Sequence, residues 1–181
     1  MKFKTSRFGE LEISDSEKVS FPEGILGFSK HQNYCLVDPG DDTLILWLQS
    51  LDDENIAFPV LEPRIFKSNY LVKLSAQELK SLQLDNINQS IVFTILTIPR
   101  DVPQMTANLK APVVINLRKQ LGKQVVLQEN EYTLKHLMFK ELKSHLATIQ
   151  ANRGKQPQER PAISLPINLR SMAPSAHIQT L

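Results

Sequence analysis

The sequence predicts a mainly β protein, a compact antiparallel barrel-like domain with small helices and a flexible C-terminal tail. Short apolar runs recur through most of the chain, and Gly, Pro, Asp and Asn turn signals separate them. Few stretches have helical spacing or helix caps. The end of the chain is rich in Pro, Gln, Arg and Ser and shows little periodicity, so it cannot bury enough surface to offset its ordering entropy. In this 181-residue chain we therefore expect a domain over residues 1–146 and a basic tail over 147–181.

The chain opens with an expected β-hairpin. Residues 2–6 and 10–13 form its two strands, and Gly9 supplies the positive φ that a tight turn needs. Residues 18–21 form another short strand, which Pro22 ends. The loop that follows is too apolar to be free, so we expect it to fold back onto the core. Its apolar residues, counted from the end of the strand, are Phe21, Ile25, Leu26 and Phe28.

Three further strands are expected over residues 33–37, 44–48 and 56–61. Asp38-Pro-Gly-Asp-Asp42 is a strong turn signal after the first, and Asp52-Asp-Glu-Asn55 forms the turn between the other two. Pro59 lacks the N–H that a ladder needs, so it indicates a strand edge or a bulge. Residues 63–74 are mixed loop and strand by pattern.

The second half begins with a helix signal. Ser75 and Glu78 have capping-box spacing and predict a helix over residues 76–82. The clearest strand covers 90–98, and residues 132–146 end in a helix. Between them, Ala111 to Asn116 is expected as a buried strand that leads into a hairpin with 123–128. The polar turn Thr106–Asn108 would deliver the chain into that strand, with Pro112 at its start.

The charge is strongly uneven, although the net charge is only +2. Between Phe8 and Pro63 the sequence has twelve acids and two bases, Lys18 and Lys30, so this stretch carries −10. Residues 143–181 carry +4. An acidic face attracts basic partners and repels nucleic acid. The alternative interpretation is an ordinary solvated surface.

No residue set predicts catalysis, a cofactor or a metal site, and we expect no enzyme. Cys35 follows His31 by four residues, but the surroundings are acidic and the cysteine lies in an expected strand, so a structural role is favoured. The four histidines are scattered. Arg118, Lys119 and Lys123 form a basic patch without aromatic residues for base stacking, so direct nucleic-acid binding is not expected. A β-barrel enzyme or small-ligand domain remains a rival hypothesis, which only a deep pocket with converging polar groups would favour.

The expected cellular compartment is inferred from features that the sequence lacks. Its first residues have no apolar signal region, and no apolar run approaches the roughly 20 residues of a membrane span. A single cysteine fits a reducing compartment. We therefore expect a cytoplasmic protein without a membrane association.

Five fragments of the chain form a specific pattern when taken together. The longest is Met105-Thr-Ala-Asn-Leu-Lys-Ala-Pro-Val-Val-Ile-Asn116. The others are Phe21-Pro-Glu-Gly-Ile-Leu-Gly-Phe28, Leu48-Gln-Ser50, Ile56-Ala-Phe-Pro-Val60 and Gln124-Val-Val-Leu127. Together they resemble the bacterial flagellar assembly factor FliW family, occur in that family's order and cover about residues 1 to 140. The tail after about Lys143 has no counterpart in this resemblance.

The resemblance implies a compact barrel-like fold and a function in partner exchange. Such proteins bind the RNA-binding translational regulator CsrA and relieve its repression of flagellin synthesis, and they also bind flagellin. We expect a monomer. The alternative is a dedicated flagellin chaperone that does not bind the regulator.

Two sets of candidate partner-binding residues follow. For the basic regulator they are the acids of two turns, Asp41, Asp42, Asp52, Asp53 and Glu54. For flagellin, the positions of the family-like motifs indicate Phe58, Thr106 and Asn108. Gln49, Thr106, Asn108 and Asn116 could organise a surface or could satisfy turns and sheet. In the tail, Ile163-Ser-Leu-Pro-Ile-Asn-Leu169 is apolar enough to be a docking segment, with plain tail as the alternative.

Overall fold

Seven strands close into a barrel in the computed structural model, which describes residues 1–40 and 44–153. They are β3 (Lys18–Ser20), β4 (Asn33–Val37), β5 (Leu46–Ser50), β6 (Ala57–Leu61), β7 (Ile91–Thr97), β9 (Val113–Asn116) and β10 (Leu121–Gln124). The order around the ring is β3-β4-β5-β6-β7-β9-β10, and β10 returns to β3. Neighbouring strands are antiparallel except β10 and β3, which meet in parallel at Leu121 and Ser20. The prediction of a mainly β, barrel-like fold is confirmed.

Four short strands lie outside the ring. β1 (Lys2–Thr5) and β2 (Gly9–Glu12) form the N-terminal hairpin, and Gly9 adopts a φ of 70° in its turn. β8 (Thr106–Ala107) pairs with the end of β7 and with β11 (His136–Leu137). The hairpin was predicted. The strand β8 was not, because Thr106 was placed in a turn.

Two α-helices and four 3-10 turns complete the described chain. In α1 (Ala76–Ser81), the Glu78 N–H donates to the Ser75 side chain at 3.2 Å, while Glu78 accepts the Ser75 N–H at 2.7 Å, as the capping box predicted. Helix α2 (Phe139–Arg153) continues beyond Leu146, where we had placed the end of the domain. The 3-10 turns are η1 (Asp15–Glu17), η2 (Pro63–Ile65), η3 (Ile87–Gln89) and η4 (Val102–Gln104).

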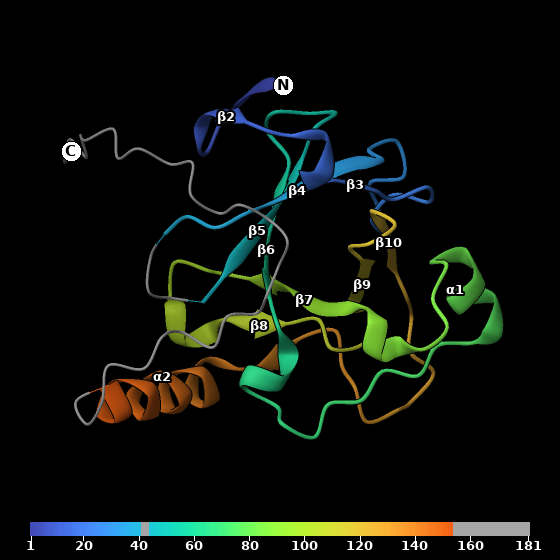
Figure 1. The fold of residues 1–181 in the computed structure, drawn as a ribbon. Helices are drawn as coiled ribbons and strands as arrows, with labels where there is room; N and C mark the ends of the chain where they lie inside the picture. Colours follow the sequence, from blue (N-terminus) through green and yellow to red (C-terminus); the bar gives the residue numbers. More distant parts are fainter. Residues whose placement is uncertain (41–43, 154–181) are drawn as a thin grey trace.

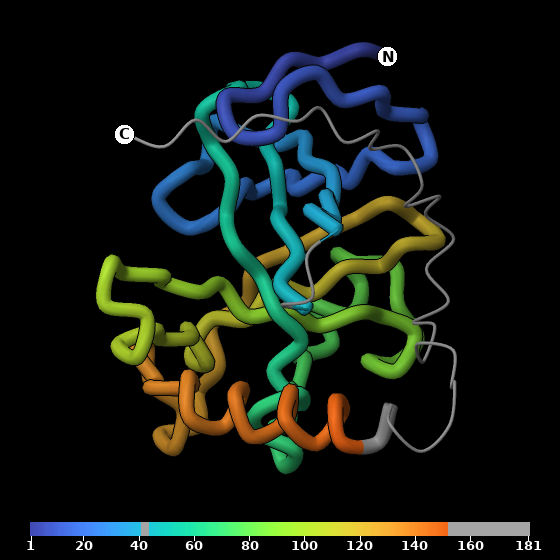
Figure 2. The backbone as a smooth tube through the Cα atoms, turned by 90° about the vertical axis from the view of Figure 1, so that its left-hand side faces the viewer, coloured from blue at the N-terminus to red at the C-terminus, as the bar shows by residue number. Residues whose placement is uncertain are grey.

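The N-terminal hairpin and α2 lie at opposite ends of the molecule in both views (Figures 1 and 2). Apolar residues of the hairpin, among them Leu11 and Ile13, cover Cys35 and Val37 on the outside of β4. Arg7 lies over the Trp47 ring, with its guanidinium carbon 4.0 Å from the ring centroid. This small cluster fastens the hairpin to the barrel wall.

Large apolar side chains from the strands of the ring fill the barrel interior. Phe21 and Tyr34 are the largest of them, and both are fully buried. Their rings meet edge to face with centroids 5.1 Å apart. Gly122 on β10 makes room for Phe21, because a Cβ atom there would lie only 2.2 to 2.5 Å from carbons of the ring. The other buried residues of this core are Val19, Ile25, Leu36, Leu48, Val60, Phe93, Val113 and Ile115.

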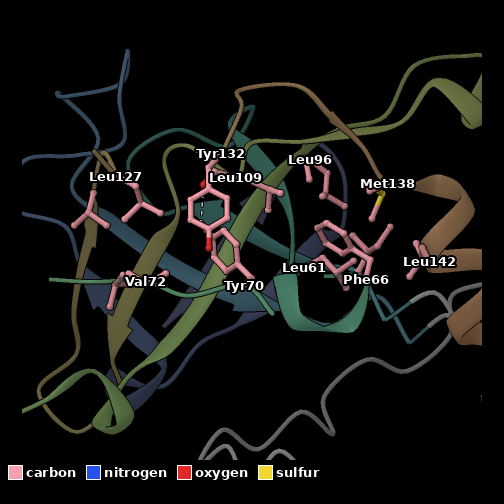
Figure 3. Close-up of a cluster of buried hydrophobic side chains, with 14 of the residues drawn as sticks. Leu61, Phe66, Tyr70, Val72, Leu96, Leu109, Leu127, Tyr132, Met138 and Leu142 are labelled. Carbon is pink, nitrogen blue, oxygen red and sulfur yellow. Dashed lines mark hydrogen bonds between the residues drawn. The ribbon is translucent and has the colours of Figure 1, made fainter. Parts of the chain in front are cut away.

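A larger core lies between the outer barrel wall and the segments that cover it (Figure 3). Tyr70 and Tyr132 pack together in this core with ring centroids 4.7 Å apart. The Tyr70 hydroxyl donates to the Leu109 carbonyl at 2.7 Å, and the Tyr132 oxygen accepts the Leu71 N–H at 3.0 Å. Leu142 attaches α2 to the same cluster.

Three local predictions need correction. The expected strand over 44–48 begins instead at Leu46, because Leu44 has a φ of 64° and is exposed. Within 63–74 the structure has η2 and loop, with no strand. In the loop after Pro22, Ile25 is buried as expected, but Leu26 and Phe28 remain 58% and 36% exposed. Pro59 fits its prediction, since β6 pairs with β7 only at Val60 and Leu61.

Candidate functional site

One end of the barrel gathers most of the candidate residues that the structure describes. We call it the acidic end and define it as residues 22–34, which lead into β4, and residues 50–58, which join β5 to β6. Two side chains at the end of β5 hold the turn at its centre. The Ser50 hydroxyl accepts the N–H groups of Asp52 and Asp53 at 3.1 and 3.2 Å. Buried Gln49 donates to the carbonyls of Ser50 and Ile56. The turn is therefore rigidly placed.

Asp52 joins the two segments of the acidic end. Its carboxylate accepts the backbone N–H groups of Gln32 and Asn33 at 2.6 and 2.8 Å, and the Asn33 side-chain amide at 2.9 Å. Partial desolvation opposes ionisation, but these hydrogen bonds outweigh it and lower the pKa of Asp52. Although Asp52 is exposed and charged, its hydrogen-bonding capacity is largely used by the fold.

Asp53 and Glu54 are the acids that remain available at this turn. Asp53 accepts the Asn55 N–H at 2.9 Å, a local Asx contact. Glu54 is exposed and contributes only its backbone carbonyl, which accepts the Ser6 N–H at 3.0 Å. Within the described part of the chain, the salt bridges involve neither residue. Exposed Glu54 is therefore the acid most open to a basic partner, and Asp53 is half-buried beside it.

Aromatic side chains lie next to this turn. Phe58 on β6 meets Phe28 edge to face with ring centroids 5.0 Å apart, and the Tyr34 ring centroid lies 6.4 Å from that of Phe58. The Leu26 N–H donates at 3.0 Å to buried Gln124, whose amide also donates to the Ala111 carbonyl. Gly24, with a φ of 68°, lets the loop fold tightly on itself, since a Cβ would lie 2.6 Å from the Phe28 carbonyl oxygen. This loop presents apolar side chains at the barrel end.

Three buried polar atoms without a hydrogen-bond partner also occur here. Among the described residues they are His31 Nδ1, Tyr34 Oη and Gln49 Oε1. Burial, and to a smaller extent the negative charge of Asp52, raise the pKa of Tyr34 to about 12, so its hydroxyl stays protonated. Each unsatisfied group costs about 1–3 kcal/mol in a folded protein. The sequence offers no signal for them, because lack of a partner depends on three-dimensional packing.

The remaining candidates lie elsewhere. Thr106 pairs with Thr97 and Leu137, and β7 separates its strand from β6 and Phe58. Asn108 supports the chain reversal before β9: its side chain accepts the Ala111 N–H at 2.9 Å, and its carbonyl accepts the Thr94 hydroxyl. Asp41 and Asp42 fall outside the described residues. The structure thus brings Phe58 together with Asp52, Asp53 and Glu54, and keeps Thr106 and Asn108 apart from them.

Asn116 closes β9 as a structural residue. Its side-chain amide donates to the carbonyls of Leu82 and Gln83 at the end of α1, at 2.9 and 3.1 Å. Its oxygen accepts the N–H groups of Arg118 and Lys119. The third base of the predicted basic patch, Lys123, pairs with Glu23.

The described residues contain little that could perform covalent chemistry. Burial raises the pKa of the Cys35 thiol to about 12, which leaves it protonated and unreactive. No group of three or more His, Cys, Asp and Glu side chains in residues 1–40 and 44–153 could hold a metal ion. A hollow of about 320 Å³ is lined by Glu62, Arg64, Asn88 and neighbouring apolar residues, but none of the three unsatisfied atoms belongs to its lining. None of the described helices is both long and apolar enough to span a membrane.

Comparison with known proteins gives a consistent result. The sequence model of the FliW protein family matches residues 2–138. The chain is 39% identical over 145 residues to the flagellar assembly factor FliW of Thermoanaerobacter pseudethanolicus, covering 80% of this chain and 97% of the relative. It is 39% identical over 146 residues to FliW of Bdellovibrio bacteriovorus, covering 81% and 83%. A crystal structure of the flagellar assembly factor FliW superposes with a TM-score of 0.72 at 34% identity, covering 77% of this chain and 97% of that one.

Proposed function

Because the chain belongs to the FliW family of flagellar assembly factors, we propose that it binds CsrA and flagellin in a partner switch. Binding of CsrA relieves the repression of flagellin synthesis, and flagellin that accumulates displaces CsrA and restores it. The exchange takes place in the cytoplasm between protein ligands, with this chain as a monomer. It requires no covalent step and no direct contact between this chain and nucleic acid.

The acidic turn is the observation that carries the CsrA half of the proposal. Glu54 is exposed and Asp53 is half-buried on a rigid turn, and neither is paired with a basic side chain within the described residues. An RNA-binding regulator is expected to be basic, and opposite charge raises its association rate. The effect acts over about 8 Å at physiological ionic strength, so it depends on salt.

The flagellin half is assigned to the aromatic side of the same end. Phe58 lies four residues beyond Glu54, and Phe28 presents the exposed part of the aromatic pair. A contact there would cover the acidic turn as well, so we propose that the two partners exclude each other sterically. Thr106 and Asn108 would belong to a second, separate flagellin contact. Asn108→Arg is a poor test of that contact, because this side chain supports the backbone at Ala111.

Stopped-flow association with CsrA at two salt concentrations tests the proposal. The double variant Asp53→Asn/Glu54→Lys should associate more slowly than wild type at low salt and show a weaker salt dependence. Asp52 is left intact because its carboxylate holds Gln32 and Asn33. The control is Asp101→Lys/Glu141→Gln, which also changes the net charge by +3 and replaces exposed acids away from this turn, Asp101 making no cap hydrogen bond at η4. Equal association rates for wild type and the double variant at low salt would show that the acidic turn is only a solvated surface.

The alternative function, a flagellin chaperone that leaves the regulator alone, makes a different prediction. The wild-type chain would then bind flagellin but would not change the affinity of CsrA for RNA. Titrating the chain into a CsrA–RNA complex and following RNA release by fluorescence anisotropy distinguishes the two functions. Adding flagellin should reverse the release only in the partner switch.

A further inference from the structure

The pairing between β6 and β7 ends early and leaves a hollow beside the first residues of β7. The two strands share only two residue pairs within the described chain, the last between Leu61 and Thr94, and the chain then turns away into η2. A hollow of about 320 Å³ lies at this point, and its lining includes residues 62–64 after β6 and residues 90–92 at the start of β7. Tyr70 of the larger core also lines it (Figure 3). The hollow therefore lies at the opposite end of β6 from the acidic turn.

The backbone of Val92 points toward this hollow. The Ile95 carbonyl accepts the Asn108 N–H at 2.9 Å, so Ile95 directs its backbone groups toward β8 and β9, on the side of β7 away from β6. Successive residues of a strand direct their N–H and C=O groups to opposite sides in turn. Thr94 and Val92 therefore direct theirs toward β6. Thr94 has Leu61 opposite it, whereas Val92 lies beyond the last residue pair and lines the hollow.

Pro63 explains why the ladder stops before Val92. In the register that β6 and β7 share, Pro63 would stand opposite Val92. Proline has no N–H to donate, and the Pro63 carbonyl already accepts the N–H groups of Phe66 and Lys67 at 3.2 and 2.9 Å. Within the described chain, no backbone hydrogen bond joins Val92 to residues 62–74. A free donor and acceptor on the edge of a strand are a template for pairing with another extended chain.

Two opposite charges line the hollow without pairing with each other. Among the described residues, the salt bridges include neither Arg64 nor Glu62. Arg64 is exposed, and its Nε donates only to the Tyr70 carbonyl, at 3.5 Å. A guanidinium has five N–H donors in a planar fork, so the others can bind a carboxylate in bidentate geometry. Glu62 is half-buried and would repel an acid placed against it. The lining therefore favours an acid close to Arg64 and away from Glu62.

We propose that this hollow binds a short extended segment of a partner protein that carries an acidic residue. One residue of the segment exchanges both backbone hydrogen bonds with Val92, and the acid pairs with Arg64. A volume of about 320 Å³ is at the lower end of the range for ligand pockets, so few residues of the partner enter. The contact goes beyond the partner switch, because it leaves the acidic turn free.

The composition of the chain's own tail does not match this hollow. The apolar segment of residues 163–169 lies outside the described residues and contains no acid that could pair with Arg64. The single acid between residues 143 and 181, Glu159, is followed directly by Arg160, which would bring a base close to Arg64. The occupant is therefore assigned to another protein.

Amide NMR spectra of the full chain test the backbone contact. Titration with the blocked peptide acetyl-Val-Asp-Val-amide should shift the Val92 signal until it saturates, while the signals of residues 51–56 in the acidic turn stay in place. The same peptide with its amide nitrogens methylated cannot donate to the Val92 carbonyl and should bind about tenfold more weakly. The absence of a saturable shift at Val92, or equal affinity for the two peptides, would overturn the proposal.

Charge variants of the full chain test the role assigned to Arg64. Arg64→Gln should weaken binding of acetyl-Val-Asp-Val-amide by up to about fivefold, the effect of one surface ion pair. Glu62→Gln should strengthen it, and acetyl-Val-Lys-Val-amide should respond in the opposite direction to both variants. Arg100→Gln, which replaces an exposed base outside the lining, is the control and should leave both affinities unchanged. Equal affinity of wild type and Arg64→Gln for the acidic peptide contradicts the proposal. Neither test contains CsrA or flagellin, so failure here leaves the proposed partner switch unaffected.

Discussion

At the scale of single residues, a polar side chain at the acidic end can serve the fold, a partner, or both. Asp52 and Glu54 are two positions apart in one turn, yet Asp52 accepts three hydrogen bonds from Gln32 and Asn33, while the Glu54 side chain makes none with residues 1–40 and 44–153. The difference arises because Asp52 faces the chain entering β4. Charge reversal at Asp52 would therefore disturb the loop, whereas reversal at Glu54 changes only the surface.

Asp52→Asn should lower stability in a pH-dependent way. At pH 7 the amide loses one acceptor oxygen, and we expect a cost of about 1 kcal/mol. The pKa of Asp52 is lowered in the folded state, so its contribution is complete above the unfolded value near 3.9 and is lost as pH falls through the folded pKa. Urea unfolding of both proteins should show the same difference at pH 7 and 4.5 and a smaller one at pH 3. A difference that stays constant with pH would contradict this role for the carboxylate.

Asn116→Ala should be more costly, because Asn116 is buried and makes hydrogen bonds on both sides. The substitution leaves the carbonyls of Leu82 and Gln83 without this donor, with an expected cost of about 2 kcal/mol. Asn88→Ala, at an exposed position in η3, is the control and should stay within about 0.5 kcal/mol of wild type. Thermal or urea unfolding measures both. Equal stability of the two variants would mean that Asn116 is not a structural link.

At the scale of elements, the sequence predicted well those helices and strands that depend on local signals. It did not predict those that depend on pairing with strands remote in sequence. The capping box fixed α1, and the strands β4 and β7 followed from continuous apolar runs with clear breaks. The two-residue strand β8 escaped prediction, since it exists only through its partners β7 and β11, which are remote in sequence. The start of β5 was misplaced because Leu44 adopts a left-handed conformation that its residue type does not suggest.

For the candidate site too, some residues could be proposed from the sequence and other features could not. Glu54 and Phe58 could be proposed from charge and from motif position, and the structure places both at the acidic end. Thr106 and Asn108 lie on the other side of β7. The exposure of Phe28 and the unsatisfied Tyr34 hydroxyl could not be predicted, because apolar loops usually pack inward and hydrogen-bond satisfaction requires coordinates.

Gly122→Ala should destabilise the barrel through its interior. The new methyl group would overlap the Phe21 ring, and overpacking of this kind costs about 1–3 kcal/mol. Phe21→Leu creates space at the same place, so the double variant should be more stable than the sum of the two single effects predicts. Urea unfolding of the four proteins gives the coupling energy. Strict additivity would show that Gly122 and Phe21 do not constrain each other.

At the scale of the whole molecule, the layout separates acidic and basic parts of the chain. The −10 stretch between Phe8 and Pro63 supplies the second strand of the N-terminal hairpin, the acidic turn and the strands β3 to β6. The C-terminal part carries +4 and begins in helix α2, which lies at the other end of the domain (Figure 1). A basic partner, or the basic part of another copy of the chain, should therefore be attracted to the acidic end of the domain.

We expect α2 to contribute to the stability of the domain and the residues beyond Arg153 to contribute little. Within α2, Leu142 is only 4% exposed and packs in the larger core, so Leu142→Ala should cost about 2–4 kcal/mol. A chain that stops after Arg153 keeps this contact and should melt within a few degrees of wild type, because the Pro-rich, weakly apolar composition of residues 154–181 does not predict a packed segment. Calorimetry of the two proteins beside wild type makes the comparison. If truncation lowers the melting temperature more than Leu142→Ala does, residues 154–181 belong to the cooperative unit and the domain extends beyond α2.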